Sequence, residues 1–569
     1  MVTYLGPSAA AVAAVMAMSF ISNVLALYGP NLAGAAINEA AAGAGRVNFD
    51  RVNYFALRML ICYTASSLLT VSIHVLMARV SKGVARRMRQ DVFDKLMRLP
   101  VGFFDTHQAG DIISRVNYDI DVISTCLSTD VVAIITSVVS VVGALAMMIS
   151  ISLPLSAVAL VTVPASILYT AKMRKITRPL FIRRSKCYGR LNGFVEEMLS
   201  GQKTILAYAY EHRVEERYDE VNTDAADAYD KAQSRSMTIG PTMSFINNTC
   251  LSLIALLGSL LYMNGIIGLG AISSFVLYSR KFSGPINEIA NIINELFSAL
   301  SAAERVFDLL DEKEELKDAA GARVLSDPRG DVELRHVSFG YDPGRTILHD
   351  LSLKADAGRL IAIVGPTGAG KTTIINLLMR FYDVDSGEIL VDGQDIRQVT
   401  RASLRASYAM VLQDTWVFQG TIFDNIAYGK ENATMEEVVA AARAAHIHPF
   451  IMRLPQGYQT VITEDGGNIS KGQKQLLTIA RAMLYDANML ILDEATSNVD
   501  TSTERMIQTA MRDLMRGKTC FVIAHRLSTI RNADHILVVE RGDVVEQGTH
   551  DSLMARRGVY YRLYASQFG

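Results

Sequence analysis

The residues best suited to phosphate chemistry lie in one glycine-rich stretch in the second half of the chain. Residues 365–372 read Gly-Pro-Thr-Gly-Ala-Gly-Lys-Thr, which fits G-x-x-x-x-G-K-[ST], a loop that wraps backbone N–H groups around nucleotide phosphates. The apolar run Leu360-Ile-Ala-Ile-Val364 precedes this loop, and the helix-compatible run 373–379 follows it. The order of strand, loop and helix predicts a nucleoside triphosphate site.

Two further apolar runs end in side chains that could act on a bound phosphate. Asp493 and Glu494 follow Met489-Leu-Ile-Leu492, and His525 follows residues 519–524. Ligands bind at the carboxyl ends of strands in α/β sheets. An aspartate there suits Mg²⁺, directly or through water, and Glu494 can orient the attacking water. Strand-end acids can also be solvent-facing, and a lone histidine structural, but the upstream loop favours the catalytic interpretation.

A polar turn, Asn468-Ile-Ser-Lys-Gly-Gln-Lys-Gln475, opens a helix predicted over residues 473–484. The Ser470 hydroxyl, the backbone at Gly472 and the helix N-terminus together form an anion site. The turn lies far from the phosphate loop in sequence, so nothing local brings both to one phosphate. The alternative is an ordinary N-cap.

The composition divides the chain into two dissimilar halves. The chain has 569 residues, too many for a single ordinary hydrophobic core, so two or more domains are expected. Half of the residues are hydrophobic, concentrated in the first half, and the formal net charge is −1, which gives no sign of a nucleic-acid partner. The cysteines form no CxxC pair and predict neither a disulfide framework nor a zinc site; they are Cys62, Cys126, Cys187, Cys250 and Cys520.

The first half contains runs long enough to cross a membrane, which takes about 20 mostly apolar residues. Tight turns at Ser152-Leu-Pro154 and Asn264-Gly265 separate two pairs of them. Buried helices of a soluble core are the alternative, but little of the chain would remain to cover so many. The first run is too long for a cleavable signal and lacks a basic leader. The six windows are residues 8–35, 54–78, 131–152, 153–171, 246–263 and 266–278.

Lysine and arginine are concentrated in two connecting segments, residues 79–130 and 172–240. Basic loops stay in the cytoplasm, so six spans would place both termini and the nucleotide domain there. Apolar residues recur at helical spacing in both segments, which predicts helices that extend beyond the membrane. Breaks at residues 100–110 and 207–213 are natural points of contact with the soluble domain.

These observations predict a multidomain membrane protein. An all-α transmembrane domain of six helices, residues 1–310, is followed by a linker, residues 311–330, and an α/β P-loop nucleotide-binding domain, residues 331–569. The alternation in residues 331–339 predicts that this domain opens with an antiparallel strand.

Together the motifs resemble the ATP-binding cassette (ABC) transporter family, specifically an exporter-type half-transporter with the type IV fold, over almost the whole chain. In the family's order, Tyr341 is the adenine-stacking aromatic, residues 365–372 are Walker A and Gln413 is the Q-loop residue. Residues 469–473 are the signature, 490–494 Walker B, 497–500 the D-loop, and His525 the switch histidine.

The resemblance implies that two nucleotide domains hold two ATP molecules head to tail, so that each signature serves the opposite subunit. It implies ATP and Mg²⁺ as cofactors, Glu494 as general base, and His525 as the γ-phosphate contact. Lys371 neutralises the phosphates, and Thr372 and Gln413 ligate the metal with Asp493 close by. The implied nucleotide-binding residues are Tyr341, Gly365, Pro366, Thr367, Gly368, Ala369, Gly370, Lys371, Thr372, Thr373, Gln413, Ser470, Gly472, Gln473 and Asp500.

The signature motif departs from the usual family pattern at one position, and this bears on the identity of the partner subunit. The family signature usually reads Leu-Ser-Gly-Gly-Gln, whereas here Lys471 replaces the middle glycine. Some heterodimeric exporters carry one weakened site, and residues 464–569 resemble the catalytic-Walker subunit of bacterial heterodimeric multidrug exporters. The resemblance therefore favours a heterodimer with a second half-transporter, with a homodimer as the alternative.

The resemblance implies ATP-driven export of an amphiphilic drug-like, lipid or peptide molecule by alternating access in a bacterial cell membrane. Import of a siderophore-type molecule on the same fold and a non-transporting ATPase are the alternatives. Arg58 and His74 are expensive in lipid, so we expect them at a cavity or a partner helix. Weaker candidates for substrate contact, each equally compatible with a polar contact between helices, are Asn247, Asn248, Arg280 and Glu288.

Overall fold

The computed structural model describes residues 2–41, 43, 47–342, 344–413, 415–463, 467–493, 500–524 and 527–568. The chain forms two compact units. The membrane unit comprises Met1–Met97 and Ala109–Glu312, and the nucleotide unit comprises Arg98–Gln108 and Lys313–Gly569. A short segment between two membrane helices therefore belongs to the nucleotide unit. The domain boundaries drawn from the sequence stay predictions.

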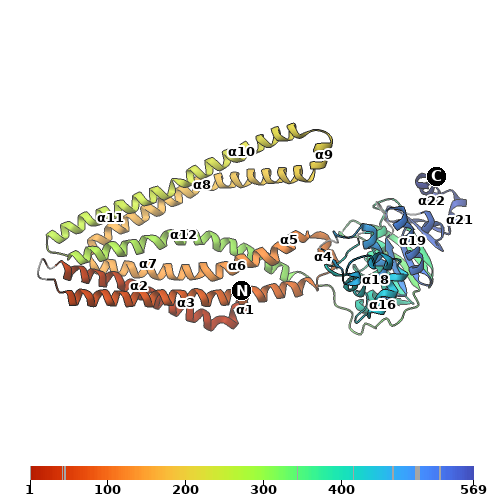
Figure 1. Ribbon diagram of the computed structural model, residues 1–569, viewed down its shortest axis with the longest axis horizontal. Coiled ribbons are helices and arrows are strands. Elements are labelled where there is room, and N and C mark those ends of the chain that lie inside the picture. The colour runs from red at the N-terminus through yellow and green to blue at the C-terminus, as the bar shows by residue number, and fades with distance from the viewer. Residues whose placement is uncertain are drawn as a thin grey trace. The chain divides into compact units, whose positions relative to one another are not determined.

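All secondary-structure elements in the described part of the membrane unit are helices (Figure 1). Two π-helical turns, η2 (Arg115–Asp119) and η3 (Cys126–Asp130), interrupt the segment that leads into α7. Its α-helices are α1 (Val2–Leu5), α2 (Ala9–Ala40), α3 (Phe49–Leu96), α5 (Ala109–Ser114), α6 (Ile120–Thr125), α7 (Val131–Ile151), α8 (Leu153–Ser200), α9 (Gln202–Ala207), α10 (Glu211–Met237), α11 (Ile239–Met263) and α12 (Leu269–Asp311).

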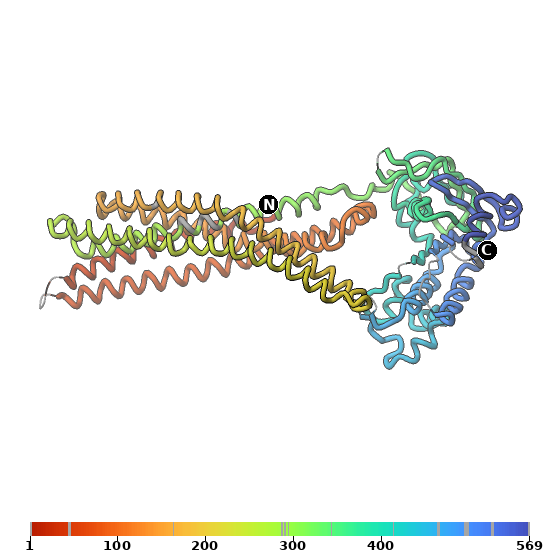
Figure 2. The backbone as a smooth tube through the Cα atoms, turned by 90° about the horizontal axis from the view of Figure 1, so that it is seen from above, coloured from red at the N-terminus to blue at the C-terminus, as the bar shows by residue number. Residues whose placement is uncertain are grey.

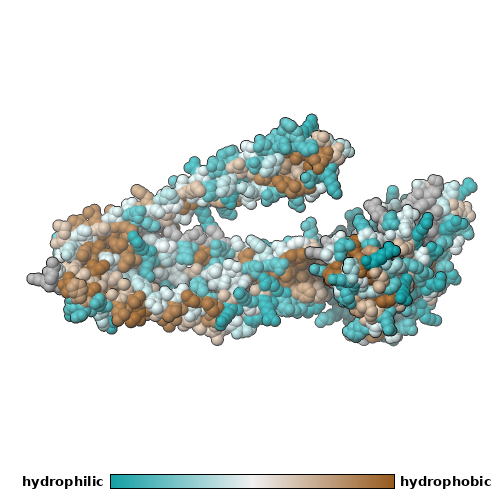
Figure 3. Space-filling model, viewed as in Figure 1, coloured by the Kyte–Doolittle hydropathy of each residue, from teal (hydrophilic) through white to brown (hydrophobic). Residues whose placement is uncertain are grey.

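Five helices among the described residues are long and apolar enough to cross a membrane. They contain the first five windows predicted from the sequence, except for Ser152 in the turn between α7 and α8. The sixth window falls largely in α12, where Arg280 and Lys281 follow shortly after the apolar run ends. Apolar side chains such as Leu60 and Leu256 lie exposed on these helices, and Figure 3 shows brown patches over the left part of this unit.

The predicted tight turn at Ser152 is confirmed, because α7 ends at Ile151 and α8 begins at Leu153. The Ser152 hydroxyl accepts a hydrogen bond from the Leu155 N–H at 3.5 Å, as an N-cap does. The predicted break after Ala207 is also present. There α9 ends and α10 begins at Glu211, and α8 and α10 lie side by side with α9 at the turn between them (Figures 1 and 2).

Small residues let α2 and α12 approach closely. A Cβ on Gly34 would lie 2.5 Å from the Gly270 carbonyl oxygen. Ser274 donates to the Pro30 carbonyl at 2.8 Å, and Tyr278 donates to the Leu27 carbonyl at 2.6 Å. Such contacts hold membrane helices together where lipid supplies no hydrophobic driving force between them.

The nucleotide unit is built on a six-stranded sheet with strand order β12-β11-β3-β10-β9-β6. Its strands are parallel except β12, which is antiparallel to β11. A four-stranded antiparallel sheet has the order β2-β1-β4-β5, and β7 pairs with β8. The strands are β1 (Val332–Phe339), β2 (Leu348–Ala355), β3 (Leu360–Val364), β4 (Ser386–Val391), β5 (Gln394–Asp395), β6 (Tyr408–Val411), β7 (Gly420–Thr421), β8 (Val461–Ile462), β9 (Met489–Asp493), β10 (Thr519–Ile523), β11 (His535–Glu540) and β12 (Asp543–Gly548).

Residues of the six-stranded sheet divide between two hydrophobic cores. Ala362 and Leu492 belong to one core, whereas Ile363 and Ile491 belong to the other, as alternation along a strand requires. The fold class predicted from the sequence is confirmed. Helices of this unit are α4 (Val101–Thr106), α13 (Lys371–Leu378), α14 (Arg401–Ala406), α15 (Ile422–Ala427), α16 (Met435–Ala444), α17 (His448–Ile451), α18 (Lys471–Tyr485), α19 (Thr501–Met515), α20 (Leu527–Arg531), α21 (His550–Arg556) and α22 (Val559–Phe568).

Candidate nucleotide-binding site

The glycine-rich loop joins β3 to α13, as its sequence predicts. Gly368 and Gly370 have φ values of 80° and 103°, which a residue with a Cβ rarely adopts. A Cβ on Gly365 would fall 2.1 Å from the Val539 carbonyl oxygen. The Gly542 N–H donates to the Ala369 carbonyl at 3.1 Å. The turn between β11 and β12 therefore braces the loop, while Pro366, Thr367 and Gly368 stay exposed.

Lys371 lies inside the curve of this loop. Its Nζ donates to the carbonyls of Gly365 at 2.9 Å and Pro366 at 3.0 Å, and the residue is 9% exposed. Burial lowers the pKa of the Lys371 ammonium, and the nearby Asp493 carboxylate opposes this effect. A cation at a helix N-terminus, surrounded by loop N–H groups, suits phosphate oxygens. Thr372 is exposed beside it, and Thr373 is buried.

Oxygen-bearing side chains follow the neighbouring strands β6 and β9. Val411 pairs with Leu492, so Gln413, shortly after β6, and Asp493, at the end of β9, emerge at the same edge of the sheet. Amide, carboxylate and hydroxyl oxygens are the ligands that Mg²⁺ prefers, so this set fits the metal. Glu494 and His525 lie outside the described residues, and their catalytic roles stay predictions.

Tyr341 lies 41% exposed, with its ring edge-on to two other aromatic rings. The ring centroids lie 5.0 Å from Phe339 and 4.9 Å from Tyr382. Its hydroxyl donates to Thr373 Oγ1 at 3.3 Å and accepts from Asn376 Nδ2 at 3.1 Å. The ring predicted to stack on adenine is therefore tied directly to α13, the helix that begins at Lys371.

Ser470 forms the N-cap of α18, which begins at Lys471. Its hydroxyl accepts from the Gln473 N–H at 3.3 Å, and Gln473 Oε1 accepts from the Ser470 N–H at 2.8 Å. The turn is thus an N-cap. The Ser470 oxygen accepts this bond through a lone pair, so its O–H can still donate to an anion. The anion site remains compatible with the cap. Lys471 is exposed and Gly472 is buried.

Asp500 forms the N-cap of α19, where its carboxylate accepts from the Thr503 N–H at 2.9 Å. Hydrogen bonds from Thr503 lower the pKa of Asp500. The acid therefore stays ionised at the start of this helix.

Sequence reasoning missed Tyr382. Its hydroxyl donates to Asp105 of α4 at 2.6 Å, and a Cβ on Gly102 would lie 3.0 Å from its ring. Burial and the hydrogen bond to Asp105 raise the pKa of Tyr382, so the hydroxyl stays protonated. The break predicted at residues 100–110 is a contact with the nucleotide unit, and the residue touched there also touches the Tyr341 ring. The sequence signal is an aromatic pair, Phe381 and Tyr382, after α13.

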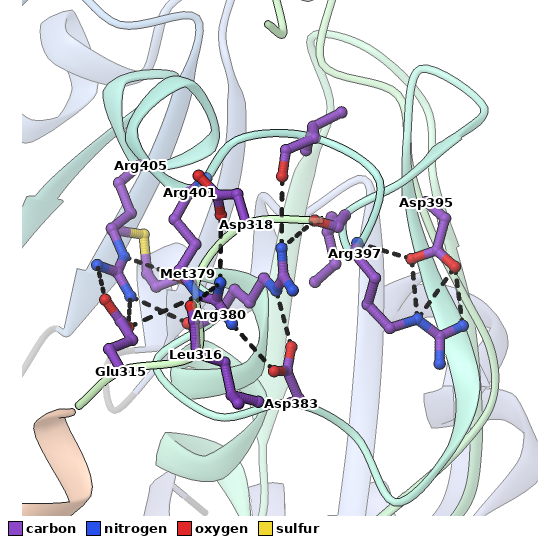
Figure 4. Close-up of polar contacts among 12 residues, drawn as sticks. Glu315, Leu316, Asp318, Met379, Arg380, Asp383, Asp395, Arg397, Arg401 and Arg405 are labelled. Atoms are coloured by element: carbon purple, nitrogen blue, oxygen red, sulfur yellow. Dashed lines mark hydrogen bonds and ion pairs between the residues drawn. The ribbon is translucent and has the colours of Figure 1, made fainter. Parts of the chain in front are cut away.

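A second missed feature is a cluster of three arginines, Arg380, Arg401 and Arg405, which joins the residues after α12 to the rest of the nucleotide unit (Figure 4). Arg401 is buried and reaches Asp318 at 3.2 Å and Asp383 at 3.0 Å. Its Nη1 also donates to the Leu316 carbonyl at 2.7 Å. The Glu315 N–H donates to the Arg98 carbonyl at 2.9 Å, so the two segments that enter this unit from the membrane helices are joined to each other.

A helical membrane domain joined to a P-loop domain with these motifs defines an ABC half-transporter of the exporter type, and the chain belongs to this family. Residues 9–286 match the ABC transporter transmembrane region, and residues 348–497 match the ABC transporter domain. The chain therefore hydrolyses ATP in a reaction coupled to transport. It lies in a bacterial membrane with its nucleotide domain in the cytoplasm.

Individual relatives extend over most of the chain. It is 48% identical over 508 residues to a fatty acid ABC transporter ATP-binding/permease protein of Mycobacterium tuberculosis, covering 89% of this chain and 80% of the relative. It is 37% identical over 493 residues to the ATP-dependent lipid A-core flippase of Escherichia coli, covering 86% and 84%. The structure of a bacterial Atm1-family ABC exporter with ATP bound matches with a TM-score of 0.77 and 31% identity, over 98% of each chain.

Proposed function

We propose that the chain exports a lipid-type amphiphile, driven by ATP, as one half of a dimer. The proposal rests on what two similar proteins are named for. Similarity extends over more than four-fifths of the chain to proteins named for fatty acid and for lipid A-core, and both substrates join acyl chains to a polar head. The exporter-type neighbour supports the outward direction.

The roles proposed for the site are those that the family resemblance implies, and the positions of Lys371 and Tyr341 support them. Lys371 and the loop N–H groups bind the β- and γ-phosphates, and the Tyr341 ring stacks on adenine. Thr372, Gln413 and Asp493 hold Mg²⁺, which would neutralise charge on the phosphates when bound. Glu494 activates water and His525 contacts the γ-phosphate. Ser470, Gly472 and Gln473 serve ATP on the opposite subunit, with Asp500 beside them.

Heterodimerisation is the second part of the proposal, and Lys471 supports it. An exposed lysine in the signature turn adds bulk and charge where family members have glycine. We expect the purified chain alone to be a poor ATPase and to gain activity with a second half-transporter. Full activity as a homodimer would overturn this part.

Transport is tested in inside-out membrane vesicles loaded or supplied with a labelled fatty acid or lipid A precursor. ATP-dependent movement into the vesicles supports export. Movement out of them would indicate import, and ATP turnover without flux of any substrate would indicate a non-transporting ATPase.

A further inference from the structure

One face of α8 changes from apolar to basic along the helix. Val161, Ala165, Leu168, Lys172 and Lys175 follow one another at alternating spacings of four and three residues, so they lie on the same face. All five are exposed, and Val161 and Leu168 are 72% and 70% exposed. This exposed face is therefore apolar as far as Leu168 and basic from Lys172 onward.

The change occurs where α8 leaves the hydrocarbon of the membrane. α8 begins at Leu153, directly after the turn at Ser152. A rise of ~1.5 Å per residue places Lys172 about 29 Å and Lys175 about 33 Å along the helix from Leu153. The hydrocarbon is ~30 Å thick, and the headgroups add roughly 5–7 Å on each side. Both lysines therefore lie at the depth of lipid headgroups on the cytoplasmic side.

α8 offers these lysines no counter-charge. The helix contains no aspartate or glutamate before Glu196, and no hydrogen-bond or ion-pair partner of Lys172 or Lys175 occurs among the described residues. Arg183, further into the cytoplasm, shows the contrasting case, because it pairs with Asp224 of α10 at 3.5 Å. Packing against α10 thus accounts for Arg183 and leaves the two lysines at headgroup depth uncompensated.

The helix next to α8 adds a further cation at this depth. The Tyr169 hydroxyl donates to the Thr238 carbonyl at 3.5 Å, which brings the end of α10 beside this part of α8. The charged residue nearest to Thr238 in the sequence is Arg235, and it is exposed. The local surface is therefore positive on both helices, and an anionic group has to come from outside this pair.

A second copy of this chain is a poor source of that anionic group. Residues 79–90 of α3, which follow its apolar run, contain five cations and no acid; the cations are Arg79, Lys82, Arg86, Arg87 and Arg89. Glu288 of α12 contacts Ser137 of α7 at 3.4 Å. Membrane lipid fits better, because its acyl chains match the face at Val161 and Leu168, and an anionic headgroup matches the lysines directly below.

We propose that this face of α8 binds anionic phospholipid, with Lys172 and Lys175 holding the phosphate of the headgroup. Lysine suits this position because its alkyl stem lies along apolar surface while the ammonium reaches the polar layer. Clusters of basic residues immediately cytoplasmic of a membrane helix attract anionic lipid. The proposal concerns lipid bound at the outside of α8, so it holds whichever substrate is exported.

The test measures which lipids contact α8. The transporter, with its partner half-transporter where one is required, is placed without ATP in nanodiscs of phosphatidylcholine. The nanodiscs contain a trace of photoactivatable lipid that has either a phosphatidylglycerol or a phosphatidylcholine head and the same acyl chains. After illumination, labelled peptides are identified by mass spectrometry. We expect the peptide containing Leu168 to be labelled more strongly by the phosphatidylglycerol probe, and added salt to reduce this preference.

The double variant Lys172→Gln with Lys175→Gln should lose the preference. Each basic residue near an anionic surface raises affinity about fivefold, so the ratio of phosphatidylglycerol to phosphatidylcholine labelling should fall about tenfold or more. Lys186→Gln with Arg190→Gln is the matched control. It removes two charges from the same exposed face, but these lie about 50 and 56 Å from Leu153, beyond the headgroups and further than the ~8 Å screening length at physiological salt. This control should keep the ratio of the unmodified protein.

Three outcomes would overturn the proposal. Equal labelling of α8 by the two probes in the unmodified protein would show that its lysines do not select a headgroup. An unchanged ratio in the Lys172 and Lys175 variant would assign the preference to other residues. Absence of labelling on α8 by either probe, while other membrane helices are labelled, would show that protein and not lipid covers this face.

Discussion

Charged side chains are paired differently in the two units of this molecule. In the nucleotide unit, Lys371 and Arg401 bond to carbonyls or carboxylates within the unit. In the membrane unit, Arg305 is paired in this way, but Arg280 is not. Lys371 and Arg401 are therefore compensated within their own unit, whereas Arg280 has no such partner among the described residues.

The largest expected effect concerns chemistry in the nucleotide unit. Glu494→Gln should lower ATP turnover by about 10²–10³-fold, because general base catalysis contributes on that scale. ATP binding should persist, since the phosphate loop is unchanged. Turnover is measured by phosphate release and binding with a fluorescent nucleotide. Near-normal turnover would remove Glu494 as the base.

Removing Arg401 from the arginine cluster should lower the stability of the nucleotide unit. Arg401→Ala would leave Asp318 without its ion-pair partner and Asp383 paired with Arg380 alone. It should cost roughly 2–3 kcal/mol of the nucleotide unit's stability, because both acids are partly exposed. The single tryptophan, Trp416, lies in this unit, so its fluorescence follows thermal unfolding. Arg397→Ala is the control. Arg397 is 42% exposed and pairs with Asp395 two residues away, so its loss should be nearly silent. Equal effects would contradict a specific role for the cluster.

A smaller effect is expected where the nucleotide unit holds α4. Tyr382→Phe keeps the ring against Tyr341 but removes the hydrogen bond to Asp105, which is worth about 1 kcal/mol. We expect substrate stimulation of the ATPase to fall while basal activity changes less. Tyr408→Phe is the control, because the buried Tyr408 hydroxyl has no hydrogen-bond partner in the described structure. If both variants retain the same stimulation ratio, the Tyr382 bond does not transmit it.

The smallest effect should come from the signature turn. Ser470→Ala removes an N-cap hydroxyl worth about 1 kcal/mol of helix stability. If Ser470 also contacts ATP on the opposite subunit, turnover with a partner should fall more than Trp416-monitored stability does. If Ser470→Ala lowers stability but not turnover, Ser470 serves only as the N-cap of α18.

The sequence was most informative where function depends on local backbone geometry. Residues 365–372 specify their own loop, and Ser152 with Pro154 specifies a turn, because neighbours in sequence form both. The sequence was less informative where the partners come from different elements. Nothing near Tyr382 points to Asp105, and nothing near Arg401 points to Asp318. Both interactions join residues that are far apart in the sequence, so they can be seen only in the folded structure.

The same limit applies to the residues expected to contact substrate. The cost of charge in a membrane span favours Arg58 and His74, yet both lie exposed on α3. The Arg58 guanidinium instead lies 4.3 Å over the Tyr54 ring on its own helix. Residue type shows that a side chain is expensive in lipid, but only the neighbouring helices show which face it occupies.

The inclusion of Arg98–Gln108 in the nucleotide unit bears on how this protein can be dissected. The polypeptide crosses between the units three times, so a cut in the linker does not release an intact cassette. A fragment beginning at Lys313 would lack Gly102 and Asp105, and would present Tyr382 and its aromatic neighbours to water. Such a fragment would expose aromatic surface that favours self-association. Rates and affinities measured on it would therefore differ from those of the nucleotide unit within the whole transporter.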